Sequence, residues 1–108
     1  MWFGCGQVFD SNGKFLRKFG AEGEMEGSLN HPHGIAIDRE GNFLVSDFAH
    51  RIQVFTSDGH FVAAFGQYGR RPMQFVGPTH VCIDNDGRII VSDYSLRLQV
   101  FGFVESAS

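Results

Sequence analysis

The sequence has few of the features that mark several common protein classes. Its 108 residues include two cysteines, Cys5 and Cys82, three prolines and one tryptophan. The two cysteines lack metal-type spacing and are too few for a dense disulfide framework, which argues against a small disulfide-stapled secreted domain. The longest apolar runs cover a few residues, far short of the roughly 20 that a membrane helix needs.

The charge also lacks a strong excess of one sign. Nine Lys and Arg residues stand against twelve Asp and Glu, a formal net charge of −3. No global basic field therefore points to nucleic acid, and a local basic patch is still open. The opening residues, MWFGCGQVFD, lack the basic and apolar regions of a signal peptide. We expect a reducing, cytoplasmic location.

Glycine and phenylalanine are abundant, with 14 and 12 residues. This composition suits short strands joined by tight turns, with large rings filling the space between sheets. Seven phenylalanines recur at fixed spacing and are expected on the faces of the sheets, where they would pack between neighbours. They are Phe9, Phe15, Phe19, Phe55, Phe61, Phe65 and Phe101.

A repeat of 46 residues organises the chain. Residues 7–52 align with residues 53–98 without a gap, and 17 of the 46 positions are identical. The run Gln-Val-Phe occurs at 7–9, 53–55 and 99–101, so a third unit begins at Gln99. We therefore assign residues 1–108 to one repeat domain with a first unit at 7–52, a second at 53–98, the start of a third at 99–101 and a tail at 102–108.

Each unit has the pattern of four short strands. Alternating apolar segments predict strands at 34–38, 43–47, 51–55 and 61–65. Hairpin turns are predicted between neighbouring strands, where a glycine can adopt positive φ at low cost. These glycines are Gly13, Gly41, Gly59 and Gly87. The connections from Gly20 to Pro32 and from Gly66 to Pro78 show little alternation and are predicted to be loops between units.

A repeat of four antiparallel strands in 46 residues is typical of a β-propeller blade. Helical repeats of this length would need long segments of 3.6-residue periodicity. The sequence shows no such segment. The predicted fold is therefore all-β, with propeller blades that form an incomplete ring.

The repeated motifs resemble those of NHL repeats, and the resemblance covers residues 7–101. In the first copy they are Pro32, Asp38-x-x-Gly41, Ser46-Asp47, the run Arg51 to Phe55, Asp58-Gly59 and Phe65-Gly66. The second copy repeats them at Pro78, Asp84-x-x-Gly87, Ser92-Asp93 and Arg97 to Phe101. An Asn-His pair typical of the family before the arginine is replaced by Ala49-His50 and by Ser95-Leu96.

The strand count predicts two strands of one blade, four of the next and three of another, which cannot close a ring. Exposed strand edges and apolar outer faces favour assembly or aggregation. Three explanations stay open. The chain is a fragment of a larger propeller, or it assembles as a ring of three chains in which the N-terminal strand pair of one completes the C-terminal blade of the next, or it is an unstable gene-model product.

The charged residues that recur are assigned structural roles. Asp47 with Arg51, and Asp93 with Arg97, are expected to join neighbouring strands or blades through charge-assisted hydrogen bonds. Asp38 and Asp84 stand beside hairpin glycines, so we interpret them as turn-forming carboxylates. No pair of carboxylates is predicted to be catalytic.

Candidate binding residues lie where the two copies differ, in the connections and in the turn between the second and third strands of each unit. Propeller topology places these segments on one face, around the central opening. The candidates are Asn30, His31, His33, Phe48, His50, Tyr68, Arg70, Arg71, His80 and Tyr94. Rings beside basic groups can stack bases and contact phosphates, which favours single-stranded RNA. The acidic residues Glu22, Glu24 and Glu26 favour a protein partner instead.

A zinc site is a weaker alternative. His33 follows Pro32, as in the zinc-dependent amidating lyases, whose propellers resemble NHL repeats and take one histidine from each of several blades. His33 and His80 are one position out of register, and no third ligand is evident in the sequence, whereas catalytic zinc usually needs three protein ligands. We expect no cofactor and no metal.

The resemblance implies a non-enzymatic module that binds protein partners or single-stranded RNA through its loop face. In tripartite-motif proteins such a propeller follows RING, B-box and coiled-coil segments, so ubiquitin-ligase association is implied for a longer parent protein. A self-assembling propeller scaffold, a trimer of two-blade chains, is the main alternative function.

Overall fold

The computed structural model describes residues 6–23 and 25–102, and every regular element in these ranges is a β-strand. No helix capable of crossing a membrane is found in this described part. The strands are β1 (Gly6–Phe9), β2 (Phe15–Phe19), β3 (Ala21–Glu22), β4 (Ser28–Leu29), β5 (Gly34–Ile37), β6 (Phe43–Asp47), β7 (Arg51–Phe55), β8 (Phe61–Phe65), β9 (Gln67–Tyr68), β10 (Gln74–Phe75), β11 (Pro78–Ile83), β12 (Ile89–Asp93) and β13 (Leu98–Phe101).

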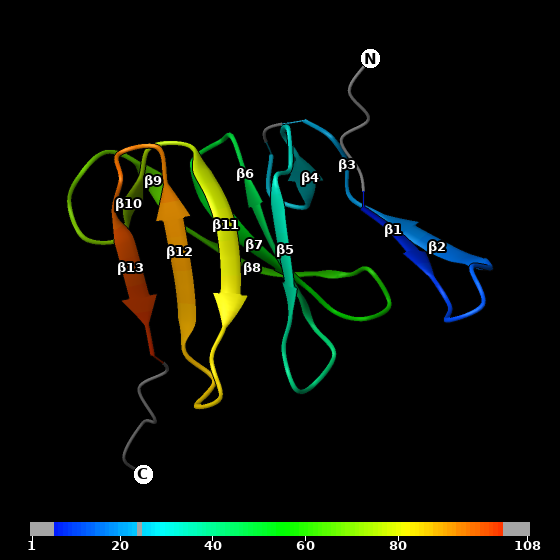
Figure 1. Ribbon diagram of the computed structural model, residues 1–108. Coiled ribbons are helices and arrows are strands. Elements are labelled where there is room, and N and C mark those ends of the chain that lie inside the picture. The colour runs from blue at the N-terminus through cyan, green and yellow to red at the C-terminus, as the bar shows by residue number, and fades with distance from the viewer. Residues whose placement is uncertain (1–5, 24, 103–108) are drawn as a thin grey trace, which may run out of the picture.

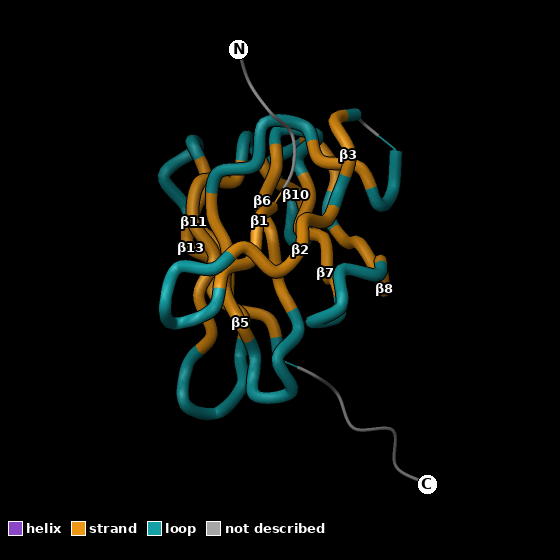
Figure 2. The backbone as a smooth tube through the Cα atoms, turned by 90° about the vertical axis from the view of Figure 1, so that its right-hand side faces the viewer, coloured by secondary structure: helices purple, strands orange, loops and turns teal. Residues whose placement is uncertain are grey.

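Three antiparallel sheets follow one another along the chain (Figure 1). We name them the first blade (β1–β2), the second blade (β5–β8) and the third blade (β11–β13). The all-β fold with blades of antiparallel strands predicted from the sequence is confirmed, and the four strands predicted at 34–65 match β5 to β8. Figure 2, a view from the side of the first blade, shows the same succession of strands and turns.

Alternation along the strands gives the second blade two apolar faces. Phe43 and Val45 of β6 point to the first blade and pack with Phe19. Leu44, between them, packs with Val81 of the third blade on the opposite face. Because both faces are covered, β6 and β7 are buried along almost their whole length.

The inner strands of the second and third blades run side by side. A Cβ built on Gly34 of β5 would lie 3.1 Å from both the carbonyl oxygen of Thr79 and the Cα of His80 in β11. A side chain at this position would require the neighbouring strand to shift by a few tenths of an ångström, so glycine suits this close approach. Figure 1 shows β5 and β11 in the front of the molecule, with the outer strands of the second blade behind them.

The connections between blades contain more regular structure than the sequence predicts. We predicted loops at 20–32 and 66–78, whereas β3 pairs in parallel with β4, and β9 with β10, at two residues each. Each connection folds back on itself through a backbone hydrogen bond, from Gly23 N to Leu29 O at 3.1 Å in one and from Gly69 N to Phe75 O at 3.1 Å in the other. Strands of two residues are too short for the alternation that marks longer ones.

This fold-back inserts one apolar side chain between adjacent blades. Leu29 and Phe75, which are 46 positions apart, are both fully buried, and we call each of them a plug. Each lies against the glycine at the start of its own connection, where a Cβ on Gly66 would be 2.5 Å from the Phe75 ring and one on Gly20 would be 2.8 Å from Leu29. The repeated Phe-Gly pairs at 19–20 and 65–66 are therefore required by packing as well as by positive φ.

The phenylalanines fill the spaces between blades, but not all of those predicted to do so are covered. Phe19 and Phe55 are buried with ring centroids 4.9 Å apart. Phe9 and Phe15 of the first blade are 52% and 50% exposed, because no further blade lies over them in the described residues. For Phe9 the difference comes from position at the end of the array, because its repeat equivalent Phe55 is 1% exposed, whereas Phe61, the equivalent of Phe15, is itself 36% exposed.

Candidate functional site

The predicted candidate residues gather at one end of the strands, which we call the loop end. It carries both connections between blades and the β6–β7 and β12–β13 turns, whereas the β5–β6 and β11–β12 turns lie at the opposite end (Figure 1). This arrangement follows from antiparallel strand order, which returns alternate turns to the same end.

A buried polar cluster fastens the first connection to the second blade. Arg51 of β7 forms a salt bridge through Nε with Asp47 of β6 at 3.0 Å. Its Nη2 donates to Ser28 O at 2.8 Å. Gln53 accepts a hydrogen bond from Gly27 N at 2.8 Å, and its amide donates to Ser28 O and to Asp47. We call Asp47, Arg51 and Gln53 clamp 1.

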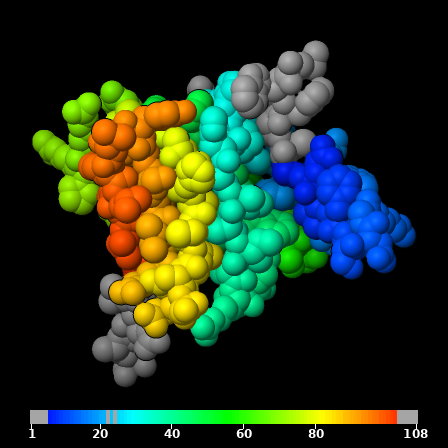
Figure 3. All heavy atoms as spheres, viewed as in Figure 1, coloured from blue at the N-terminus to red at the C-terminus, as the bar shows by residue number. Residues whose placement is uncertain are grey.

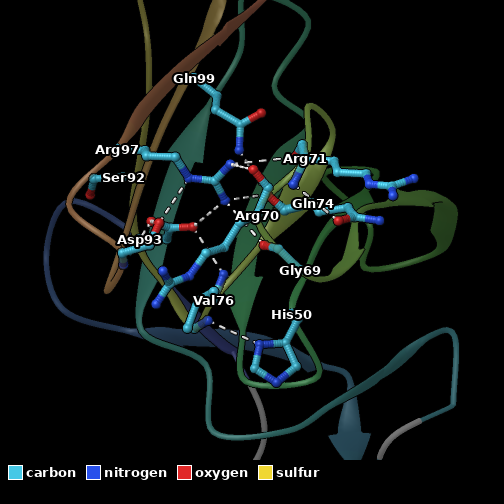
Figure 4. Close-up of polar contacts among 12 residues, drawn as sticks. His50, Gly69, Arg70, Arg71, Gln74, Val76, Ser92, Asp93, Arg97 and Gln99 are labelled. Atoms are coloured by element: carbon cyan, nitrogen blue, oxygen red, sulfur yellow. Dashed lines mark hydrogen bonds and ion pairs between the residues drawn. The ribbon is translucent and has the colours of Figure 1, made fainter.

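The third blade repeats this cluster with Asp93, Arg97 and Gln99, which we call clamp 2 (Figure 4). Arg97 donates to Asp93 at 3.1 Å and to the carbonyl oxygens of Gly69 and Gln74. The Gln99 amide donates to Gln74 O at 2.7 Å, and its oxygen accepts from Met73 N at 3.0 Å. Both clamps therefore hold the connection that precedes their own blade.

The carboxylate of clamp 2 has a perturbed pKa. Burial alone would raise the pKa of Asp93, but hydrogen bonds from the Ser95 hydroxyl, Val76 N and Arg97 outweigh burial and hold the pKa below its ordinary value. Asp93 is therefore ionised at neutral pH.

Four rings from three segments form one row at the loop end, and we call His31, His33, Phe48 and Tyr94 the ring row. Phe48, in the β6–β7 turn, is at its centre and stacks on His33 with centroids 4.1 Å apart. His31 and Tyr94 lie on the Phe48 ring with centroids 6.1 Å away in each case. The structure thus brings together residues that are up to 63 positions apart in the sequence.

The row sits on backbone turns that the two repeats share. Phe48 N donates to Asn30 O at 2.7 Å, and Tyr94 N donates to Val76 O at 2.8 Å. Phe48 and Tyr94 are equivalent positions, so the turn places one ring from each blade at the loop end. Tyr94 is 62% exposed, whereas Phe48 is partly buried by its neighbours.

His50 links the ring row to the second connection. Its Nδ1 accepts a hydrogen bond from Gly77 N at 2.9 Å, and its ring meets the Tyr68 ring edge to face with centroids 4.9 Å apart. A hollow beside His50 is lined by Glu26, Phe48, Ala49, His50, Arg51, Ala64, Gly66 and Gln67. The loop end therefore offers an aromatic strip next to a depression that contains both an acidic and a basic group.

The remaining predicted residues are placed around this strip. Arg70 and Arg71 are exposed in the second connection, where their carbonyl oxygens accept hydrogen bonds from Arg97. His80 lies in strand β11, paired with Ser92, rather than in a loop. Of the glutamates predicted to repel RNA, Glu26 is exposed beside the hollow, and Glu24 lies outside the described residues.

The alternative zinc site finds no support in the arrangement of ligands. The repeat position of His33 is occupied by Thr79 in the third blade, and the Thr79 hydroxyl contacts the Ser92 hydroxyl at 3.0 Å. Within residues 6–23 and 25–102, no three His, Cys, Asp or Glu side chains are grouped to hold a metal ion.

One family model matches the chain. The NHL repeat matches residues 29–55, which run from the buried Leu29 through β5 and β6 to the end of β7 and include clamp 1. Residues 29–55 therefore have the pattern of an NHL repeat. The same segment one period later is 75–101, from Phe75 to the end of β13, and it has the same plug and clamp. NHL repeats are blades of propellers that serve protein interaction.

Some residues that organise the loop end were not singled out in the sequence. Gln53 and Gln99 were noted as part of the repeated Gln-Val-Phe run, and their role in holding the connections was not predicted. Leu29 and Phe75 were placed in loops. Recurrence one period apart marks Gln53 and Gln99 as required by the blade, whereas at the plug position only the apolar character recurs, as Leu29 and Phe75, which is a weaker signal.

Proposed function

We propose that the chain is a non-enzymatic docking module whose loop end binds an extended segment of a protein partner. The observation that carries this proposal is the ring row, in which rings from three loops form one continuous aromatic strip. Aromatic side chains provide large contact area at low entropic cost and are enriched at protein interfaces. The NHL repeat match supports the same class of function.

The charges around the strip favour a peptide over a nucleic acid. The exposed Glu26 lines the hollow next to His50 and would repel phosphate, while it can pair with a basic side chain. The net charge of −3 gives no general attraction for a polyanion. The exposed Arg70 and Arg71, close in the sequence to the exposed Tyr68, favour RNA instead.

A binding selection tests the proposal. The full chain is panned against a random peptide library, and enriched peptides are measured against Phe48→Ala, Tyr94→Ala and a control, Asp86→Ala. Asp86 is 78% exposed at the end opposite the loop end, so its loss should leave binding unchanged. We expect each loop-end variant to weaken binding about tenfold, the scale of a lost interface ring.

A single-stranded RNA pool, measured at two salt concentrations, provides the contrary outcome. The partner class would be RNA rather than peptide if three results are obtained together. The RNA affinity falls steeply with salt, it is lost in Arg70→Ala or Arg71→Ala, and no peptide is enriched. Absence of both peptide and RNA binding by a folded sample would contradict a docking role for the loop end. The tripartite-motif and ubiquitin-ligase context implied by the resemblance concerns a longer polypeptide and stays a prediction.

A further inference from the structure

The outer face of the third blade carries the side chains that the second blade buries. Leu98 and Val100 are 73% and 57% exposed, whereas Ile52, the equivalent of Leu98, is fully buried against the third blade. Figure 3 shows β11, β12 and β13 (yellow to red) spread across the side turned to the viewer. The equivalent pairs are Ala36 and Cys82, Leu44 and Ile90, Ile52 and Leu98, and Val54 and Val100. The chain itself thus shows that another blade covers such a face.

At the other end of the array, apolar side chains of β5 and β1 are likewise left uncovered. Ile35 and Ile37 of β5 are 55% and 63% exposed, whereas Val81, the equivalent of Ile35, is 7% exposed and packs on the neighbouring blade. Phe9 is 52% exposed, whereas its equivalent Phe55 is 1% exposed. In the described residues the first blade consists of β1 and β2, so nothing from it reaches Ile35 or Ile37.

Strands β1 and β13 both hold the repeat position of β7, and each makes one of the two strand pairings that β7 makes. In the second blade, β7 pairs with β6 at one edge and with β8 at the other. In the described residues, β13 pairs with β12 and leaves its other edge free, while β1 pairs with β2 alone. Both strands contain Gln-Val-Phe, and their registers are those of β7.

We propose that β1 of a second copy of this chain replaces β13 in the third blade and brings β2 with it as the fourth strand. The second blade of that copy then covers the outer face of the third blade, as the third blade covers the second within one chain. The exchange is head to tail, and each copy contributes two complete blades. Because propellers have four to eight blades, a closed ring contains two to four copies.

The contacts made by β13 have replacements in β1. Gln7 takes the position of Gln99, which binds Gln74 O and Met73 N. Phe9 takes the position of Phe101, whose ring centroid lies 5.3 Å from that of Phe65. Arg97, immediately before β13, has no such replacement, because its repeat equivalent in the incoming chain is Cys5.

The exchange also removes unfavourable exposure. Phe9, Ile35 and Ile37 become covered, and the free edges of the first and third blades become paired. Leu98 gives up little, because it is already 73% exposed. β13 is displaced without a new partner, and the incoming β1 makes counterparts of the strand pairing and of the Gln and Phe contacts that β13 gives up. This inference concerns the blade faces and does not depend on docking at the loop end.

Three phenylalanine variants of the full chain test the exchange, with mass measured by light scattering and native mass spectrometry over a concentration series. Phe9→Ser should raise the dissociation constant of the assembly about tenfold, because Phe9 becomes buried in the partner blade. Phe101→Ser should favour assembly, because it weakens only the strand that is displaced. Phe15→Ser is the control, since Phe15 has similar exposure to Phe9 but occupies the position of the half-exposed Phe61.

Hydrogen exchange of the unmodified chain gives a readout that does not depend on variants folding. In the assembled species the amides of β1 should exchange more slowly than in the monomer, and those of β13 more rapidly, because β1 gains a second paired edge and β13 loses its pairing. A discrete species of two to four copies with this pattern supports the exchange. A monomer at every concentration, an assembly with β13 still protected, or equal effects of Phe9→Ser and Phe15→Ser would overturn it.

Discussion

At the scale of single residues, the two clamps have the same chemistry in different surroundings. The Arg51 side chain is 9% exposed and its partner Asp47 is fully buried, whereas the Arg97 side chain is 27% exposed. Removal of one partner from a buried ion pair leaves an uncompensated charge, and this penalty falls as water gains access. The clamps therefore allow one interaction to be compared at two depths within one molecule.

Asp47→Asn should lower the free energy of unfolding by about 3–5 kcal/mol, because Arg51 then lacks its carboxylate in a buried site. Asp93→Asn should cost clearly less, because Arg97 is more exposed and keeps four carbonyl acceptors. Urea unfolding of both variants gives the comparison. Equal losses would show that burial does not control the strength of these clamps.

The lowered pKa of Asp93 predicts a dependence of stability on pH. Because the folded pKa is below the ordinary value of 3.8, the stabilisation is fully present above about pH 4 and is lost as the pH falls through the folded pKa. The difference in unfolding free energy between the unmodified chain and Asp93→Asn should therefore be constant from pH 5 to 7 and shrink below pH 4. A difference that grows in acid would contradict the predicted sign.

Leu96 has an unfavourable backbone conformation. It has a φ of 66° and is 96% exposed, so its side chain has little packing to compensate for the left-handed geometry. Leu96→Gly and Leu96→Asn should each raise the free energy of unfolding by about 0.5–1 kcal/mol, since both residues tolerate positive φ. Thermal melts at one protein concentration provide the measurement. Leu98→Asn, at an exposed position within β13, serves as the control and should not be stabilising.

At the scale of elements, the connections determine how adjacent blades meet. Phe75 is fully buried between the second and third blades, and its ring packs on Phe65 and Phe101. Phe75→Ala should cost about 3–5 kcal/mol through the cavity left behind. Phe75→Leu should cost much less, because the equivalent plug is Leu29. Chemical denaturation distinguishes the two, and similar losses would mean that the plug position needs an aromatic ring.

The sequence was a good guide to the blades and a poor one to the connections. Alternation of apolar residues and hairpin glycines located β5 to β8, because strands of four or five residues are long enough for the alternation to be recognised. The two-residue strands β3, β4, β9 and β10 leave no such pattern. Leu29 was therefore invisible as a plug, and the role of Gln53 depended on a fold-back that the sequence did not reveal.

At the scale of the whole molecule, the loop end was located in advance because antiparallel order determines which turns share an end. The convergence of His31, His33, Phe48 and Tyr94 depends on how two blades tilt against each other, which is decided by packing between them. His80 was placed among the loop residues, whereas β11 already begins at Pro78, two residues before it. The ligand-binding roles of all these residues stay predictions.

The clamps also have a consequence for synthesis on the ribosome. Clamp 1 reaches back 23 to 26 residues, from Arg51 and Gln53 to Ser28 and Gly27, and clamp 2 reaches back over a similar span. Because these contacts are close in the sequence, a blade can bind its preceding connection soon after it is translated, before later segments are made. Arrested nascent chains with residues 1–65 clear of the exit tunnel should already resist protease around Ser28. If the chains resist protease only when residue 101 has emerged, the two blades fold simultaneously rather than one after the other.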